Sequence, residues 1–334
     1  MNILITGGAG FVGSQLGYNL YSQGHTVTLL DNMSFGHKDN LNINGKTFGK
    51  FILDDIRSKT LNDHMKDIDY VYHFAGIAPL PNCQEDPYEA VDVNVSGTAN
   101  VLECARQNGV KRVIFSSTSA LYENNKISPF KESDDINPDL IYSTTKWQAE
   151  KLCHSFYHTY KLPIVVLRFF NVYGPHQDFQ RKQPPLTGYL IKEFLTNGTP
   201  ILHSNGEQRR DYVYIDDLLD ICNIVMEHPK AIGETFNVAS GKTISVKEIV
   251  EKISSNFLKT NTPIYRNANK FWDKYPKLFA GEYPLQETRL IKEVEKFSQG
   301  CTEKSKNYLN WEAKTTFEDG FKNSVEYAKK LGLQ

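Results

Sequence analysis

The stretch ILITGGAGFVG, residues 3–13, decides how this chain begins to fold. Its apolar start has the composition of a buried strand, and glycines follow without an intervening loop. Gly7, Gly10 and Gly13 permit a tight turn and let backbone amides approach a pyrophosphate. The glycine spacing alone is weak evidence, because it also fits a turn that binds nothing. Its place between an expected strand and an expected helix predicts a dinucleotide-binding turn.

A second strand-like run, TVTLLD, ends on Asp31. This carboxylate follows the glycines by about 20 residues, where it can accept hydrogen bonds from the ribose hydroxyls of an adenosine. Taken alone, Asp31 is more simply a turn residue at the end of a strand. Together with the glycines it predicts a bound dinucleotide, and because a carboxylate repels a 2'-phosphate, the pattern favours NAD over NADP.

Short β-branched runs alternate with amphipathic stretches through the first half of the chain. Further strands are expected at IDYVYHFAG, RVIFSST and PIVVLRFF, and helices from about Val12 to Gln23 and from Val91 to Gly109. This alternation predicts an α/β fold with a Rossmann-like, doubly wound parallel sheet and helices on both faces. The looser pattern nearer the C-terminus predicts a smaller, mixed α/β lobe.

The change of pattern near Pro175 sets the expected domain boundaries. Residues 1–175 should form the NAD-binding domain, and residues 208–240 should return to it. Residues 176–207 and 241–334 should form the substrate lobe.

Composition argues against several kinds of partner. The formal net charge is -1 and the basic residues are scattered, which predicts no nucleic-acid or anionic-membrane surface. No stretch approaches the roughly 18 apolar residues of a membrane span, and the opening MNILITGG lacks a signal core, so we expect a cytoplasmic protein. The cysteines are odd in number and far apart, which predicts reduced thiols and no structural metal. They are Cys83, Cys104, Cys153, Cys222 and Cys301.

A tyrosine followed by a lysine four residues later occurs at Tyr122, Tyr142 and Tyr157. The first lies in a polar loop, and the third lies at the far end of an expected helix, just before Pro163. Only Tyr142 opens an amphipathic helix, in YSTTKWQAEK, so that it shares a helix face with Lys146. The alternative for Tyr142 by itself is an ordinary packing aromatic.

Tyr142 and Lys146 are the residue types expected of a base and of a cation that lowers the pKa of that base. A free tyrosine has a pKa near 10, so ionisation near neutral pH requires about 4 kcal/mol. A lysine about 5 Å away supplies on the order of 3 kcal/mol at an effective dielectric constant of about 20. The positive nicotinamide ring can add to it. We therefore expect Tyr142 to act as an acid/base group in a partly desolvated site.

Six motifs in order resemble the extended short-chain dehydrogenase/reductase family of nucleotide-sugar epimerases and dehydratases, and the resemblance covers nearly the whole chain. They are GGAGFVG at 7–13, Asp31, HFAG at 73–76, SST at 116–118, YSTTK at 142–146 and LRFFNVYGP at 167–175. Two later segments, QRRDYVYIDDL at 208–218 and FNVASGKTISVKEIV at 236–250, also resemble that family.

The resemblance implies a role for individual residues. Thr118, Tyr142 and Lys146 match the catalytic group, with Lys146 also holding the nicotinamide ribose. Asn171 and Arg210 match residues that bind the substrate diphosphate, and Thr118 also faces the substrate. The cofactor-binding residues implied are Gly7, Gly10, Phe11, Val12, Gly13, Asp31, Asn32, Asp55, Ile56, Phe74, Ala75, Gly76, Asn94, Ser116, Tyr142, Lys146 and Phe170.

The residues after Thr118 distinguish branches of the family. Sugar 4,6-dehydratases carry an Asp-Glu pair there, and the decarboxylating branch carries a glutamate at the second position, whereas this chain has Ser119 and Ala120. The small pair resembles the 4-epimerases, which implies C4 inversion of a nucleotide-diphosphate sugar, with a UDP-sugar favoured, through a 4-keto intermediate and tightly bound NAD. The alternatives are a 4,6-dehydratase, a 2-epimerase, a C4 oxidase or a non-catalytic NAD-binding regulator.

Two features depart from the family pattern. Glu123 stands where the family usually has a glycine, and the C-terminal Arg-x-Gly-acid element is not evident between Tyr265 and Arg289. The aromatic segment FWDKYPKLF has two interpretations, a partial lid or a packing role, and the packing role is the simpler one. The family resemblance also implies a homodimer formed through helices near residues 92–108 and 143–160.

Overall fold

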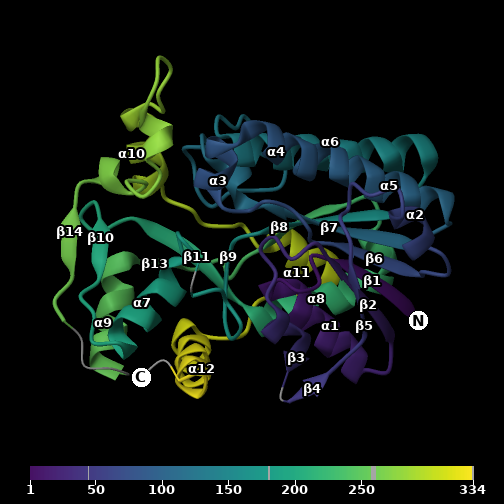
Figure 1. The fold of residues 1–334 in the computed structure, drawn as a ribbon, viewed down its shortest axis with the longest axis horizontal. Helices are drawn as coiled ribbons and strands as arrows, with labels where there is room; N and C mark the ends of the chain where they lie inside the picture. The colour runs from purple at the N-terminus through teal and green to yellow at the C-terminus, as the bar shows by residue number, and fades with distance from the viewer. Residues whose placement is uncertain (44, 180, 257–260, 333–334) are drawn as a thin grey trace.

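A seven-stranded parallel sheet lies at the centre of the computed structural model, which describes residues 1–43, 45–179, 181–256 and 261–332 (Figure 1). The strand order is β12-β8-β7-β6-β1-β2-β5. This order, running outward in both directions from β1 and β6, confirms the predicted Rossmann-like, doubly wound sheet. The strands are β1 (Asn2–Thr6), β2 (Thr26–Asp31), β5 (Lys50–Leu53), β6 (Tyr70–His73), β7 (Arg112–Thr118), β8 (Ile164–Phe169) and β12 (Thr235–Val238).

Different helices cover the two faces of the sheet, because side chains alternate between the faces along each strand. Ile3 and Ile5 of β1 are buried in one cluster with residues of α1 and α8. Leu4, between them, is buried in a second cluster with residues of α5 and α6. Figure 1 shows these two layers on opposite sides of the sheet. The helices are α1 (Phe11–Ser22), α5 (Thr98–Gln107), α6 (Ile141–Tyr160) and α8 (Ile215–Glu227).

The run expected as one helix from Val91 to Gly109 divides into two kinds of turn. Asp92–Gly97 forms a π-helical segment, η2, which continues directly into α5. Such segments are rare and often occur at functional sites. Here η2 places Asn94 against the loop that follows β6, as described below.

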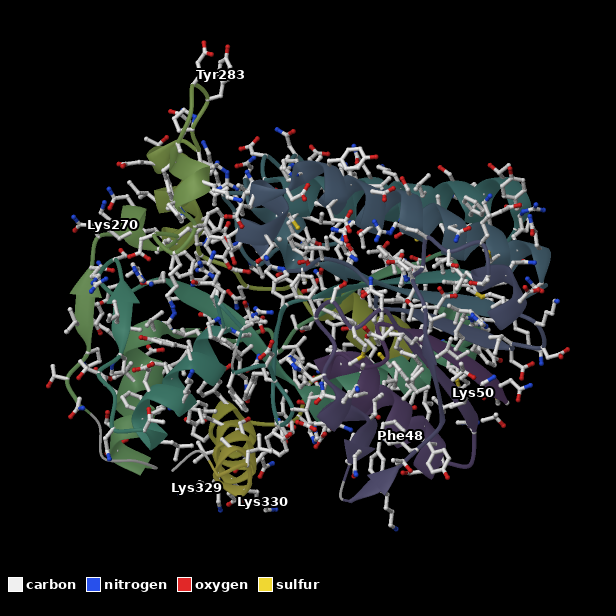
Figure 2. All side chains as sticks on the ribbon, viewed as in Figure 1. Phe48, Lys50, Lys270, Tyr283, Lys329 and Lys330 are labelled. Carbon is white, nitrogen blue, oxygen red and sulfur yellow. The ribbon has the colours of Figure 1, made fainter. Side chains whose placement is uncertain are left out.

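Strands β9, β10, β11, β13 and β14 form smaller sheets beside the main one, toward the left of Figure 1. The order β13-β11-β9 forms one, in which β11 is parallel to β9 and antiparallel to β13, and β10 pairs with β14 in another. Figure 2 shows Tyr283, 90% exposed, at the tip of the segment that projects before α10. These strands are β9 (Asn171–Tyr173), β10 (Ile201–His203), β11 (Arg209–Tyr214), β13 (Thr243–Ser245) and β14 (Ile264–Arg266), and the helices near them are α7 (Leu186–Leu195), α9 (Val246–Asn256), α10 (Glu287–Glu295) and α12 (Phe317–Lys330).

Short elements complete the fold. They are β3 (Asn42–Ile43), β4 (Lys46–Thr47), α2 (Leu61–His64), α3 (Leu80–Glu85), α4 (Pro87–Val91), α11 (Glu303–Leu309) and the turns η1 (Lys38–Leu41), η3 (Ser119–Tyr122), η4 (Pro229–Ala231), η5 (Ala268–Lys270) and η6 (Pro276–Phe279). Both α8 and β12 belong to the segment 208–240 that was expected to return to the first domain, and β12 pairs with β8. The division into two domains stays a prediction. Within the described ranges, none of the helices combines the length and apolar character that crossing a bilayer requires.

Candidate active site

The glycine turn, residues 7–13, connects β1 to α1 and packs closely on the segment after β6. Gly7 has a φ of +73°, and a Cβ added to it would lie 2.8 Å from the backbone nitrogen of Ala75. A Cβ on Gly13 would lie 2.2 Å from the carbonyl oxygen of Gly7. The turn therefore exists in this form only with glycine at both positions. No side chain caps the N-terminus of α1 at Gly10, so its first amides remain available to an anion such as a pyrophosphate.

A cavity of about 380 Å³ opens beside the glycine turn. Many of the residues expected to bind the cofactor line it: Gly7, Gly10, Asp31, Asn32, Asp55, Ile56, Phe74, Ala75 and Gly76. They come from the carboxyl ends of β1, β2 and β6 and from the loops after β2 and β5, the edge at which doubly wound sheets bind nucleotides.

Asp31 and Asp55 make this cavity acidic at one end. The Asp31 carboxylate accepts hydrogen bonds from the backbone nitrogens of Ala9, at 3.0 Å, and Met33, at 2.8 Å, although burial raises its pKa. The Asp55 carboxylate accepts two bonds, each 2.9 Å, from the Arg57 guanidinium, which lowers its pKa to about 2. Asp55 is thus ionised at any physiological pH, and an added 2'-phosphate would meet repulsion here.

A larger cavity of about 870 Å³ adjoins the first, and Gly10, Phe35 and Gly76 line both. The site residues expected from sequence that line it are Gly10, Phe11, Gly76, Thr118, Tyr142, Phe170, Asn171 and Arg210. The structure therefore brings the glycine turn, the end of β7, the start of α6 and the end of β8 around one space. Its volume lies in the range of about 300–1,000 Å³ that is typical of small-molecule sites.

Five expected cofactor residues do not line either cavity: Val12, Gly13, Asn94, Ser116 and Lys146. Asn94 supports the wall, because its side chain bonds the backbone nitrogen of Ile77 at 2.8 Å and the hydroxyl of Thr145 at 3.1 Å. Ser116 donates to the carbonyl of His73 at 3.2 Å. These residues hold the loop after β6 against α6 and β7.

Tyr142 is partly buried at the start of α6, beside the Thr118 hydroxyl. Burial raises its pKa to about 12, and the hydrogen bond with Thr118 acts in the opposite direction. The cation that lowers this pKa is Arg181, whereas the sequence argument relied on Lys146. Burial lowers the pKa of Lys146 to about 8, and its Nζ lies 4.2 Å from the centre of the Phe115 ring. The protein's own groups therefore leave Tyr142 protonated near neutral pH.

A family model described as the NAD dependent epimerase/dehydratase family matches residues 3–239. The chain belongs to this family. It is 33% identical to a UDP-glucose 4-epimerase of Halalkalibacterium halodurans over 75% of this chain and 79% of that protein. It is 32% identical to a UDP-N-acetyl-alpha-D-glucosaminuronate decarboxylase of Bacillus cytotoxicus over 75% of this chain and 78% of that protein. The structure of a Thermotoga maritima UDP-glucose 4-epimerase with UDP-glucose superposes with a TM-score of 0.86, at 30% identity and 99% coverage of both chains.

Membership makes this chain an NAD-dependent enzyme of the epimerase/dehydratase family and makes NAD its cofactor. The residues present fit that cofactor. The glycine turn leaves no room for a Cβ at positions 7 and 13, the N-terminus of α1 is uncapped, and the carboxylate of Asp31 reaches the smaller cavity. Matches to both an epimerase and a decarboxylase leave the reaction type to be proposed from the site.

Of the three tyrosine-lysine spacings, only that of Tyr142 places its tyrosine in a cavity wall. The Tyr122 hydroxyl is buried, donating to Asn237 at 2.9 Å and accepting from Arg168 at 2.6 Å. Tyr157 packs beside Gly233, near the end of α6, away from both cavities. The other two tyrosines are therefore structural in this fold.

Asn171 and Arg210 of the epimerase/dehydratase pattern line the larger cavity but already have protein partners. The Asn171 amide donates to the carbonyl of Asp211 at 2.8 Å. The Arg210 guanidinium donates to the carbonyls of Glu293 and Val294, each at 3.0 Å, and to that of Lys296. Because these carbonyls close the C-terminus of α10, Arg210 holds that helix as well as facing the cavity.

Sequence reasoning missed Arg181. This side chain lines the larger cavity, its Nε donates to the carbonyl of Gln183 at 2.7 Å, and burial lowers its pKa. Its charge acts on both Tyr142 and Tyr275. The only signal in the sequence was the basic pair in HQDFQRKQPP, which gives no indication that Arg181 turns toward Tyr142.

Proposed function

We propose that this enzyme inverts C4 of a UDP-sugar and keeps its NAD through the cycle. The observation that carries the proposal is the wall of the larger cavity next to Tyr142, where Thr118 is followed by Ser119 and Ala120. Neither of the last two can act as the extra acid or base that removing water or carbon dioxide from the sugar requires. Inversion at C4 needs a base, a partner for the oxygen and a hydride carrier.

NAD, held by the residues around the smaller cavity, would supply the hydride acceptor and donor for C4 of the sugar. Tyr142 removes the proton of the C4 hydroxyl, and Thr118 hydrogen-bonds the same oxygen. Tyr142 must be ionised to do so, and its pKa of about 12 means that a positive charge additional to the protein groups has to be present when it acts. The 4-keto sugar then turns about its diphosphate tether, and Tyr142 returns the proton on the new face.

We propose that the smaller cavity holds the adenosine part of NAD, with Asp31 on its ribose and Asp55 and Ile56 beside the adenine. Lys146 lies one helical turn after Tyr142 on α6 and is proposed to bind the nicotinamide ribose. Asn171 and Arg210 are proposed to bind the substrate diphosphate. The other cofactor residues implied by the resemblance keep that proposed role, as direct ligands where they line a cavity and as supports of its wall where they do not.

We further propose that two copies associate through the helices near residues 92–108 and 143–160. Tyr88, on α4, is 82% exposed, and Tyr160, at the end of α6, is 54% exposed. Covering such apolar area stabilises an interface by about 25 cal/mol per Å². Gel filtration with light scattering measures the association, and a Tyr160→Asp variant should shift it toward the monomer.

The test of the reaction is incubation with UDP-, GDP-, CDP- and dTDP-sugars without added NAD, followed by NMR and mass spectrometry. The expected result is the C4 epimer of a UDP-sugar, with mass unchanged and turnover sustained on the NAD that copurifies. A product whose mass is lower by that of water would indicate elimination instead of epimerisation. A product whose mass is lower by that of carbon dioxide would indicate decarboxylation, the reaction for which one relative is named. Product formation that stops without added NAD indicates an oxidase. Binding of NAD without any product indicates a regulator.

A further inference from the structure

Glu123 departs from the family pattern, and its carboxylate is completely buried, with none of the side chain exposed. It closes the short η3 turn that follows β7, so it is fixed relative to Thr118 at the end of that strand. Burying a carboxylate costs free energy unless hydrogen bonds and an opposite charge compensate. The contacts that compensate Glu123 all involve the start of α6 or the helix α10.

The first set of contacts holds the residues just before Tyr142. One oxygen of Glu123, Oε1, accepts the backbone N–H of Asp139 and, at 2.9 Å, that of Leu140. Leu140 is the N-cap of α6, and Tyr142 is the second residue of that helix. The next amide, of Ile141, donates to the Gln84 side chain at 2.6 Å. Glu123 thereby joins the strand that carries Thr118 to the helix that carries Tyr142.

The second contact pairs the negative charge of Glu123 with the positive charge of Arg289. The other oxygen, Oε2, lies 2.7 Å from Nη2 of Arg289, a side chain that is only 14% exposed. Arg289 belongs to α10, whose C-terminal carbonyls accept hydrogen bonds from Arg210 in the wall of the larger cavity. The next residue, Asn124, also connects the segment before α6 to α10. Its side chain donates a hydrogen bond to the carbonyl of Asn137 at 2.7 Å and accepts one from Lys292 of α10.

We propose that Glu123 is a positioning residue for Tyr142, with Arg289 as its counter-ion, and that this pair fixes the distance between the Tyr142 and Thr118 oxygens. The proposal rests on the proposed function of Tyr142 as the base. Without the carboxylate, the amides of Asp139 and Leu140 lose their buried acceptor and the first turn of α6 can shift. A displacement of 1 Å at a reacting group can lower the rate about 100-fold.

The test compares variants of the full-length enzyme with its copurified NAD. Glu123→Ala removes both contacts, and Glu123→Gln keeps an oxygen that can accept the two amides. Arg289→Met leaves the carboxylate buried without its cation, and the double variant Glu123→Gln with Arg289→Met removes both charges. The matched control is Asp217→Ala, because the Asp217 carboxylate also accepts two backbone amides, those of Lys314 and Thr315, each at 3.0 Å, at a place remote from Tyr142.

The expected kcat of Glu123→Ala is about 10- to 100-fold below wild type with KM changed less than about threefold, because positioning acts on the chemical step. Glu123→Gln should stay within about fivefold of wild type, and Arg289→Met should fall about 10-fold and recover in the double variant. Hydrogen exchange should become faster at the amides of residues 139–141 in Glu123→Ala. Asp217→Ala should lower the melting temperature and leave kcat within about twofold.

Two results would overturn the proposal. One is a Glu123→Ala enzyme with wild-type kcat, and the other is an equal loss of kcat in Asp217→Ala at the same loss of stability. If Glu123→Ala does not fold, an Arg289→Met enzyme with wild-type kcat is decisive against it. Failure of the proposed function is distinguishable, because the wild type would then form no C4 epimer while the exchange of residues 139–141 could still report the contact.

Discussion

Replacing Tyr142 with phenylalanine removes one oxygen from the wall of the larger cavity and leaves the ring in place. The loss of a positioned acid/base group lowers kcat by about 10²- to 10⁴-fold. KM should change little, because the groups proposed to hold the diphosphate, Asn171 and Arg210, come from β9 and β11. The assay is conversion of the UDP-sugar identified by the substrate panel, measured as initial rates over a range of substrate concentrations.

The free energy needed to ionise Tyr142 shows how much a nearby positive charge has to contribute. At pH 8, a phenol with a pKa of about 12 is ionised in about one molecule in 10⁴, which corresponds to about 5 kcal/mol. A unit charge about 5 Å away supplies on the order of 3 kcal/mol at an effective dielectric constant of about 20. The positive nicotinamide ring, at such a distance, would supply more than half of this free energy. Lys146→Met should lower kcat by up to about 100-fold, because Lys146 is proposed to hold the nicotinamide ribose and a displacement of about 1 Å at the reacting groups has an effect of that size.

The dependence of kcat on pH should follow from the ionisation of Tyr142 and of Lys146. Activity should rise with pH while the base loses its proton, and it should fall as Lys146, whose pKa is lowered to about 8, loses its charge above that pH. In Lys146→Arg the falling limb should move to higher pH, because a guanidinium stays charged. A Tyr142→Phe enzyme within tenfold of the wild-type kcat, still loaded with NAD, would show that another group is the base.

Three further predictions concern the cofactor turn, the core and the substrate. Gly13→Ala places a Cβ 2.2 Å from the Gly7 carbonyl oxygen, so the protein should purify without bound nicotinamide nucleotide, as read from its absorbance after denaturation. Burial lowers the pKa of His73 from 6.5 to about 3, so stability is complete above pH 6.5 and falls by up to about 5 kcal/mol as the pH drops to 3; acid unfolding followed by circular dichroism should show this loss reduced in His73→Asn. Arg181 lines the larger cavity, so we predict that it contacts the UDP-sugar. Arg181→Met should then raise KM by about 10- to 100-fold, the loss expected for one charged hydrogen bond of about 1.5–3 kcal/mol, and an unchanged KM would show that Arg181 makes no such contact.

The motifs found in the sequence are those whose parts lie close together along the chain. The glycine turn, the strand ending on Asp31 and the start of α6 each depend on local geometry, so spacing was enough to predict them. The family resemblance named Asn94 and Ser116 but did not give their positions behind the cavity wall. Those positions depend on the π-helical turn of η2 and on the packing of α6 against β7.

By itself the sequence determined the parallel sheet, its phosphate-binding turn and the tyrosine that opens α6. These features depend on the spacing of apolar residues and on the residue types in tight turns, both of which are properties of neighbouring positions in the chain. Only the tertiary structure decided which charges meet. It brought the charge of Arg181 near Tyr142 and paired Glu123 with Arg289. It also placed the Arg210 guanidinium where it donates hydrogen bonds to the last carbonyls of α10. Electrostatic energies depend on distance through space and on burial, and neither is a property of position along the chain.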